Sequence, residues 1–344
     1  MDDYPAVRDL LPAPSLPPEV ERAGRDRLAA AFAQERVRRR RRSARWSALA
    51  LGLAGAAAAA IVIANVAPAG VPVPHGAVAQ ADGKRFLLVA AASVAAVPDE
   101  GAWWGSTEVQ GRQFHEPGGR YVLRESESVE TWIPADPEGL TWYRQTPHGI
   151  KPATPQDEAA WVADGSPASW TFDKPTEIGR SGVVRSEPRE RLTWSTEDWD
   201  FRILTAGKPL TKMNEVPDTP EGLKALFAAD DRTTIDTAAR LLFFAPVTSR
   251  TRAAAYRLLA SMPGVTAAGQ VTDVLGRAGQ AVEYDSTEFA PPTYRGPTRT
   301  RLVIDPASGS PLSLEVRSAA DGLLLTYTAL QDSRWAEANP LEGE

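Results

Sequence analysis

One stretch of 21 residues, from Trp46 to Val66, contains no charged residue and constrains the chain more than any other feature. It reads WSALALGLAGAAAAAIVIANV, with Ile61 beginning its last apolar run. A helix needs about 20 predominantly apolar residues to cross the ~30 Å hydrocarbon core of a bilayer. The sequence therefore predicts a single transmembrane helix over residues 46–66.

Seven arginines directly precede this segment. Positive charge stays on the cytoplasmic side of a membrane helix, and a tryptophan at the segment boundary suits headgroup depth. We therefore expect a single-pass protein of the cell membrane with a cytoplasmic N-terminus and an extracytoplasmic C-terminal domain. The residues that set this topology are Arg36, Arg38, Arg39, Arg40, Arg41, Arg42 and Arg45.

Residues 46–66 allow two other interpretations. Ala67-Pro68-Ala69 resembles the small-residue cleavage site of a signal peptide, but the 45 residues before the segment are too many for an ordinary signal, and Pro68 lies within the site. A buried soluble helix would not usually carry seven arginines at one end and lack a polar face. A retained membrane anchor is therefore the favoured interpretation.

Residues 1–45 form the expected cytoplasmic tail, with 11 arginines against 7 acidic residues. An Arg-rich amphipathic helix is expected there, with an apolar stripe at Val20, Leu28 and Phe32. The stripe could bind a cytoplasmic protein partner, or the tail could act only to fix orientation and touch anionic lipid. The tail contains no histidine and no cysteine, which excludes a zinc-binding anti-sigma domain.

The rest of the chain divides into a proline-containing linker at 67–81, an extracytoplasmic domain at 82–335 and a C-terminal tail at 336–344. Residues 67–344 hold 27 basic and 37 acidic residues, a net charge of −10. An acidic domain offers no footprint for a nucleic acid. We therefore expect no nucleic-acid partner, and the predicted transmembrane helix makes the membrane an expected partner.

Hydrophobic and turn patterns predict an α+β fold for the extracytoplasmic domain. A helix is expected over 83–97, strands from Trp103 onward, helices at 219–229, 234–245 and 249–262, and C-terminal hairpins around Asp305–Gly309 and Asp321-Gly322. This order favours one curved, half-barrel-like antiparallel sheet with helices packed on one face. Residues 147–190 are rich in Pro, Gly and Ser and are expected to loop over the sheet.

Eight of the ten tryptophans lie between Trp103 and Trp199. They favour core packing in a sheet over a ligand-stacking platform. Trp132 and Trp142 alternate with polar neighbours in adjacent strand-like runs, so both are expected on the same face of the sheet core.

No catalytic motif is present in the sequence. Cysteine is absent, and the chain has no HExxH, GxSxG or GxxxxGK[ST] pattern. The three histidines are expected in the linker or in loops, and the acidic group at Glu197, Asp198 and Asp200 is favoured as a solvated turn over a calcium site. We therefore expect no catalytic, cofactor-binding or metal-binding residue and no enzyme activity.

Four stretches carry a resemblance to a known family: RVRRRRRSARWSALALGLAGAAAAA; FLLVAAASVAAVPDEGAWWGSTEV; RESESVETWIPADPEGLTWYRQ; and LLASMPGVTAAGQVTDVLGRAGQAVEYD with TRLVIDPASGSPLSLEV. Together they resemble a family of uncharacterised single-pass membrane proteins of actinobacteria, over about residues 5–335. The C-terminal hairpins more weakly resemble periplasmic sigma-factor regulators with a lipoprotein-carrier-like half-barrel. That second resemblance implies an apolar cleft for a lipid-like ligand.

Three functions compete on this basis. The first is an envelope sensor or regulator that couples an extracytoplasmic binding domain to a cytoplasmic partner such as a sigma factor. The second is a membrane-tethered module that binds a lipid or lipoprotein. The third, a cell-surface enzyme, is least favoured.

Overall fold

The computed structural model describes residues 75–342 apart from Pro98, Pro137, 198–214 and 287–288. These residues belong to a compact unit, Val71–Glu344. Within the described part, no helix has the length and apolar character needed to cross a membrane. The predicted membrane segment, marked by Trp46, Ile61 and Val66, lies outside it, and so does the whole tail of residues 1–45.

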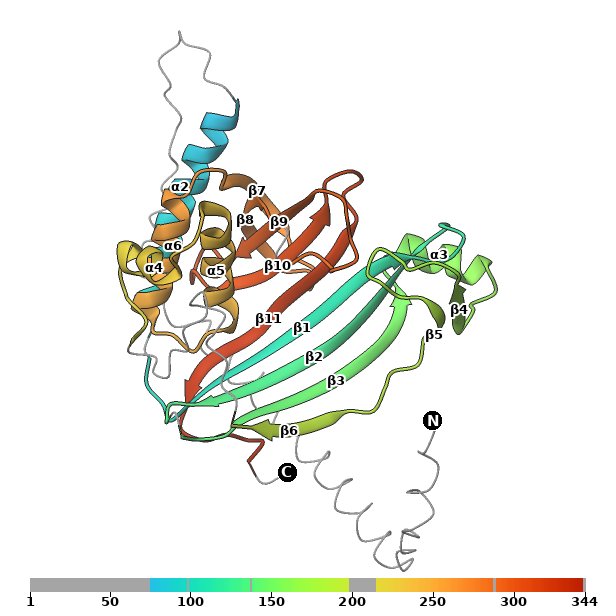
Figure 1. Ribbon diagram of the computed structural model, residues 1–344, viewed down its shortest axis with the longest axis horizontal. Helices are drawn as coiled ribbons and strands as arrows, with labels where there is room; N and C mark the ends of the chain where they lie inside the picture. The colour runs from blue at the N-terminus through green and yellow to red at the C-terminus, as the bar shows by residue number, and fades with distance from the viewer. Residues whose placement is uncertain (1–74, 98, 137, 198–214, 287–288, 343–344) are drawn as a thin grey trace, which may run out of the picture. The chain divides into compact units, whose positions relative to one another are not determined.

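Nine strands form one fully antiparallel sheet in the order β6-β3-β2-β1-β11-β10-β9-β8-β7 (Figure 1). The strands are β1 (Trp103–His115), β2 (Val122–Pro134), β3 (Thr141–Pro152), β6 (Leu192–Thr196), β7 (Thr266–Thr272), β8 (Ala278–Asp285), β9 (Thr298–Ile304), β10 (Pro311–Ser318) and β11 (Leu324–Ala336). Two consecutive runs of neighbours, β1-β2-β3 and β7 to β11, meet where β11 pairs with β1. The α+β class and a large antiparallel sheet are confirmed.

Four helices form a layer on one face of this sheet: α2 (His75–Val94), α4 (Pro220–Phe227), α5 (Asp231–Phe244) and α6 (Ser249–Ser261). Their apolar sides and the facing residues of β8, β9 and β10 make the main core, with Leu241, Tyr256 and Leu302 fully buried. Arg252 of α6 lies 5.8 Å from the centre of the Trp104 ring of β1. Trp104 therefore marks the helix-bearing face on the long strands.

Side-chain caps begin the last three helices. Thr219, Asp230 and Thr248 each accept a hydrogen bond from the backbone N–H three residues later. Such caps satisfy an N–H that the first turn of a helix leaves without an intrahelical partner. Because Asp230 is the cap, α5 begins at Asp231 and not at residue 234, the predicted start.

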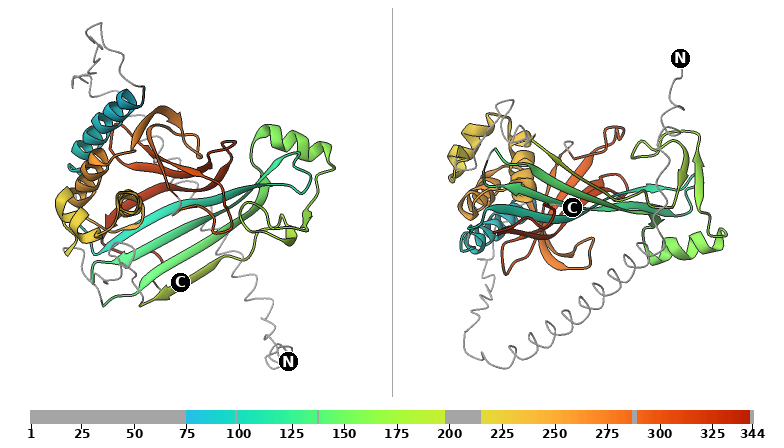
Figure 2. Two further views of the ribbon diagram at one scale, coloured as in Figure 1. Left: turned by 45° about the horizontal axis from the view of Figure 1, so that its top comes forward. Right: turned by 90° about the horizontal axis from the view of Figure 1, so that it is seen from below.

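A distal lobe occupies the far end of the long strands β1, β2 and β3. It consists of α3 (Pro155–Ala163) and a separate hairpin of β4 (Ser169–Phe172) and β5 (Gly182–Arg185). Figure 2 shows this lobe and the helical layer at opposite ends of the long strands. The prediction of loop for 147–190 was wrong here.

The predicted linker boundary was also wrong. Residues 67–81 were expected to be a linker, but α2 begins at His75 and continues to Val94. The helix is fixed by tertiary packing, since Leu87, Ala90 and Val94 are buried in the main core. Its contact with the turn after β9 is close, because a Cβ on Gly309 would lie 2.4 Å from the carbonyl oxygen of Ala90.

Trp132 and Trp142 are direct cross-strand partners and share a face, but only Trp132 is buried, so the prediction that both face the sheet core holds for Trp132 alone. Both lie on the face opposite to Trp104, since Trp132 pairs with Gly105. Trp132 is buried, with its ring against Gly105, whereas Trp142 is half-buried. Buried Trp104 and Trp170 also confirm that core packing is a main use of the tryptophans.

Candidate ligand-binding cleft

A cleft of about 850 Å³ lies over the middle of the sheet. Its floor is formed by residues of β1, β2, β10 and β11 whose side chains point to the same face as Trp104, the helix-bearing face. One wall is the distal lobe and the chain that leaves it, and the other is formed by α5 and the loop before β9. The cleft-lining side chains used below are Arg112, Glu125, Arg180, Arg185, Arg189, Arg240, Phe289, Leu314, Val316 and Thr328.

The distal wall has its own apolar core. Trp170, Phe172 and Val184 of the β4–β5 hairpin pack with Phe114 and Leu123 of the long strands. The Phe114 and Phe172 rings meet edge to face, with centroids 5.8 Å apart. This cluster is separate from the main core under the helices. The two walls of the cleft are therefore stabilised by different sets of side chains.

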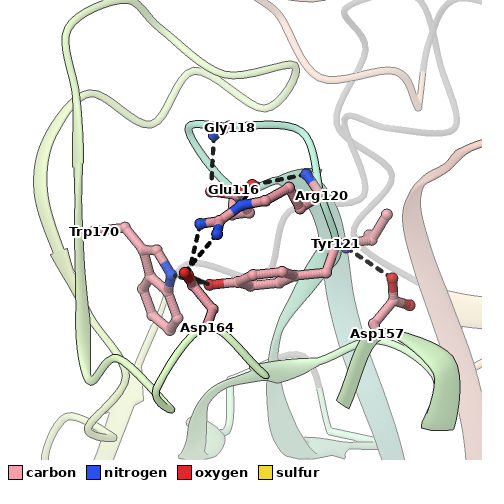
Figure 3. A network of polar contacts seen from close by, with 8 residues as sticks. Glu116, Gly118, Arg120, Tyr121, Asp157, Asp164 and Trp170 are labelled. Atoms are coloured by element: carbon pink, nitrogen blue, oxygen red, sulfur yellow. Dashed lines mark hydrogen bonds and ion pairs between the residues drawn. The ribbon is translucent and has the colours of Figure 1, made fainter. Parts of the chain in front are cut away.

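A polar network anchors the distal lobe to the β1–β2 turn (Figure 3). Arg120 donates two hydrogen bonds to Asp164, the residue that ends α3, the Nη2 bond being 2.7 Å long. The hydroxyl of Tyr121 donates to the same carboxylate at 3.0 Å and accepts from Trp170 Nε1 at 3.0 Å. Asp157 of α3 accepts a hydrogen bond from the backbone N–H of Val122, the first residue of β2. The guanidinium of Arg120 is the main cause of a lowered Asp164 pKa.

Glu116 completes the anchor at the turn. Its carboxylate accepts the backbone N–H groups of Gly118 and Arg120, each at 2.7 Å, and the Arg120 side chain at 3.2 Å. Burial alone would raise the pKa of Glu116, but these hydrogen bonds together lower it. Glu116 is thus held as a carboxylate that fixes the turn.

The two walls meet at one end of the cleft. Thr293 donates its hydroxyl to the backbone carbonyl of Glu177 at 3.3 Å, and Gly179 approaches Thr293 so closely that a Cβ would lie 2.9 Å from its methyl group. The carboxylate of Glu177 also lies 2.8 Å from Nδ1 of His115. This small contact is the bridge between the lobe and the loop before β9.

The wall next to the helices combines a cation and an aromatic ring. Arg240 of α5 lies 4.8 Å from the centre of the Phe289 ring, within cation–π range. Thr326 of β11 donates its hydroxyl to the backbone carbonyl of Phe289 at 3.0 Å. The loop that carries Phe289 is therefore tied directly to the floor.

Charged side chains dominate the distal side of the cleft. Glu125 Oε2 accepts a hydrogen bond from Arg180 Nε at 3.1 Å and forms an ion pair with Arg112 Nε at 3.1 Å, while Arg180 Nη2 contacts Oε1. Burial would raise the pKa of Glu125, but the hydrogen bond from Arg180 and the charges of Arg112, Arg180 and Arg189 lower it. The apolar lining that the half-barrel resemblance implied is thus present only in part, around Leu314 and Val316.

A second carboxylate, that of Glu108, is buried on the helix-bearing face of the sheet near the cleft. Glu108 of β1 is 4% exposed and accepts a 2.5 Å hydrogen bond from Gln110 on Oε1. Within the described chain its Oε2 has no hydrogen-bond partner. Burial raises the pKa of Glu108 to about 7, and the Gln110 hydrogen bond offsets only part of that effect.

Comparison with known proteins gives little beyond this geometry. No protein-family model matches the sequence, and no curated protein matches it. Among solved structures, the chain is similar to one titled as MucB in complex with MucA(peri), with 11% identity and a TM-score of 0.25 over 76% of this chain and 59% of that one. A structure of the Pseudomonas aeruginosa MucA/MucB complex has 12% identity to the chain and a TM-score of 0.26, over 76% of this chain and 61% of that one.

A third structure, a DUF1329 family protein from Desulfovibrio piger, gives 11% identity and a TM-score of 0.20 over 75% of this chain and 93% of that one. The chain spans about three fifths of the length of the first two structures. Similarity at these scores assigns no function to the chain.

The site residues predicted from sequence fall almost entirely outside the described range. The topology arginines from Arg36 to Arg45 and the stripe at Val20, Leu28 and Phe32 all lie within residues 1–74. Asp198 and Asp200 lie within 198–214. Across the described residues, no three His, Asp or Glu side chains gather as metal ligands.

The sequence prediction misplaced all three histidines, and His75, expected in the linker, begins α2. His115 ends β1 and His148 lies within β3, where its Nε2 is 2.7 Å from the hydroxyl of Ser128. Both had been expected in loops because prolines lie beside or close to them. Asp305 does cap its turn, accepting the Ala307 N–H and the Ser308 hydroxyl.

The cleft residues were missed because they converge from distant segments. Arg112, Glu125 and Arg180 come from β1, β2 and the loop before β5, and no sequence spacing connects them. One local signal was available: β2 alternates Leu123, Glu125, Glu127 and Val129 on one face. Charges in the middle of an otherwise apolar strand face indicate a polar hollow above the sheet.

Proposed function

We propose that this chain is a membrane-anchored envelope sensor whose extracytoplasmic domain binds a ligand in the cleft and passes its state to a cytoplasmic protein partner through residues 1–45. The observation that carries the proposal is the cleft itself, about 850 Å³ in volume and lined by side chains from both walls. Small-molecule sites are commonly clefts of about 300–1,000 Å³. The proposal includes no catalytic step.

The construction of the walls supports a sensing role. The distal lobe and the helical layer have separate apolar cores. At the end of the cleft the distal lobe contacts the loop before β9, a part of the opposite wall, through Thr293 with Glu177 and Gly179. A ligand that touches both walls would favour one spacing between them, and differential binding is what shifts a conformational equilibrium.

A second candidate function is a tethered module that holds a lipid or lipoprotein without signalling. The apolar part of the cleft, around Leu314, Val316 and Phe289, favours it. Both candidates require an occupied cleft, and they differ in whether the tail is needed.

Ligand binding is tested with the full chain, purified in mild detergent from its own cells and examined by native mass spectrometry. A co-purified mass is expected with the wild-type chain and is expected to be lost from Thr328→Trp, which fills the cleft from its floor. Leu88→Trp, on an exposed position of α2, is the matched control. An unliganded wild-type chain, or a ligand that Thr328→Trp retains, would contradict the proposal.

The tail requirement separates the two candidates. Leu28→Asp with Phe32→Asp disrupts the apolar stripe and keeps every arginine, while Ala30→Asp with Gln34→Asp places the same charges about 200° away on a helix. If the chain is a sensor, the stripe variant should fail to restore the wild-type phenotype to a strain that lacks the gene, whereas the control variant should restore it. If the stripe variant restores it fully, the tethered module replaces the sensor.

A further inference from the structure

The charge of the cleft is opposite to that of the domain around it. Among the described residues, five arginines and three glutamates line the cleft, whereas residues 67–344 carry a net charge of −10. The glutamates are Glu125, Glu127 and Glu187, and Glu127 accepts a hydrogen bond from Gln145. The positive charge is therefore concentrated in a hollow, where low-dielectric walls focus the field on a bound ion.

Two of the arginines contact a single carboxylate, and a third lines the same cleft. Arg112 and Arg180 contact Glu125 directly, and Arg189 is close enough for its charge to act on the same group. Over the described lining of the cleft, the arginines exceed the glutamates by about two positive charges.

The arginines keep donors available for a ligand. The side chains of Arg112 and Arg180 are 41% and 35% exposed, whereas Glu125 is only 17% exposed. The closest approach of Arg112 to Glu125 is by its Nε atom, at 3.1 Å. A guanidinium has five N–H donors in a planar fork that matches an oxyanion.

We propose that the cleft binds a ligand bearing a phosphate monoester, with the phosphate beside Arg112, Arg180 and Arg189. The proposal rests on the proposed ligand-binding function and names the ligand class. A phosphate monoester carries about −1.5 to −2 charges at pH 7, which matches the excess positive charge, and a monocarboxylate supplies only one. Arginine is also the side chain that binds phosphate in bidentate geometry.

The ligand is larger than the phosphate, since the cleft extends from the arginines to Leu314, Val316 and Phe289. The phosphate could belong to a soluble ester or to a lipid headgroup. The chemistry beside the arginines is the same in both cases, and the probes are chosen to distinguish the two sources.

Binding is measured by calorimetry on the detergent-solubilised full chain with glycerol 3-phosphate and with dioctanoyl phosphatidic acid. Glycerol and dioctanoylglycerol are the phosphate-free probes. Binding of both phosphate probes supports a phosphate site open to soluble esters, and binding of phosphatidic acid alone supports the site with a lipid source. Binding of neither phosphate probe, or equal binding of the phosphate-free probes, would overturn the proposal.

Three variants test the assigned residues. Arg112→Gln with Arg189→Gln should weaken the binding of a phosphate probe at least about tenfold, since a hydrogen bond to a charged group is worth about 1.5–3 kcal/mol, or roughly 10–100-fold. Arg250→Gln with Arg299→Gln, two exposed arginines outside the cleft lining, should leave it unchanged. Glu125→Gln should tighten binding about tenfold, because it removes the competing negative charge.

The gain from Glu125→Gln is an outcome that misfolding cannot produce. If Glu125→Gln weakens binding as the arginine variants do, the cluster serves only as an internal ion pair and the proposal fails. If the cleft retains a native ligand that Thr328→Trp removes but binds neither phosphate probe, this inference falls and the proposed function stands.

Discussion

Glu108 is the residue whose protonation most directly couples stability to pH. Its pKa is raised by burial from 4.5 to about 7. A carboxyl group with a raised pKa in the folded state stabilises the fold fully below its unfolded pKa and loses that contribution as pH rises through the folded value. The stabilising contribution is therefore present at about pH 4.5 and gone above about pH 7.

We predict that Glu108→Gln raises stability relative to the wild-type chain at pH 8.5 and changes it little at pH 4.5. The difference between pKa values of 4.5 and about 7 corresponds to a stability change of about 3 kcal/mol. Urea unfolding at both pH values measures it, with exposed Glu100→Gln as the control. A difference between wild type and Glu108→Gln that does not change with pH would show that Glu108 keeps an ordinary pKa.

Trp132 and Trp142 share a face but differ in burial, and their variants should differ accordingly. Trp132→Ala should cost about 3–5 kcal/mol, the usual loss for a buried large aromatic side chain. Trp142→Ala should cost clearly less, because the ring is only half-buried. Thermal or urea unfolding of both variants checks this, and equal losses would contradict the burial difference.

At the scale of elements, the polar anchor of the distal lobe should control local opening. Asp164→Asn removes the charge that Arg120 and Tyr121 contact. We expect amide hydrogen exchange in α3, β4 and β5 to become faster, while the helical layer keeps its protection, because the two have separate cores. Asp285→Asn, which breaks an exposed ion pair with Arg299, is the control. Uniform acceleration over both regions would contradict the division.

Local signals predicted some elements and failed for others for physical reasons. Thr219-Pro220 identified the start of α4, because a cap followed by proline is a strong helix signal. The same signal stands at Thr154-Pro155 before α3, where the surrounding prolines and glycines outweighed it in the sequence prediction. The hairpin at Asp305–Gly309 was predictable because Asp caps the turn and Gly309 takes a positive φ of 71°. The cleft was not, because its residues come together only in the tertiary structure.

For the whole molecule, the decisive prediction is topology. We expect a reporter fused after Glu344 to be active only outside the cytoplasm, since the seven arginines from Arg36 to Arg45 resist translocation. Replacing those arginines with glutamine should weaken or reverse the orientation. Reporter activity confined to the cytoplasm in the wild-type fusion would reverse the proposed topology and remove the envelope from the proposed function.

The floor of the cleft lies on strands and its rim on connecting segments, so the two parts should evolve at different rates in proteins descended from this one. Floor residues such as Leu314 and Val316 lie on strands whose side chains also belong to the core or border it, so selection for folding restricts them. Arg180, Arg189 and Phe289 lie on connecting segments, where substitutions and length changes are tolerated more easily. New ligand preferences can therefore arise by mutation of the rim alone, with the inherited scaffold unchanged beneath it.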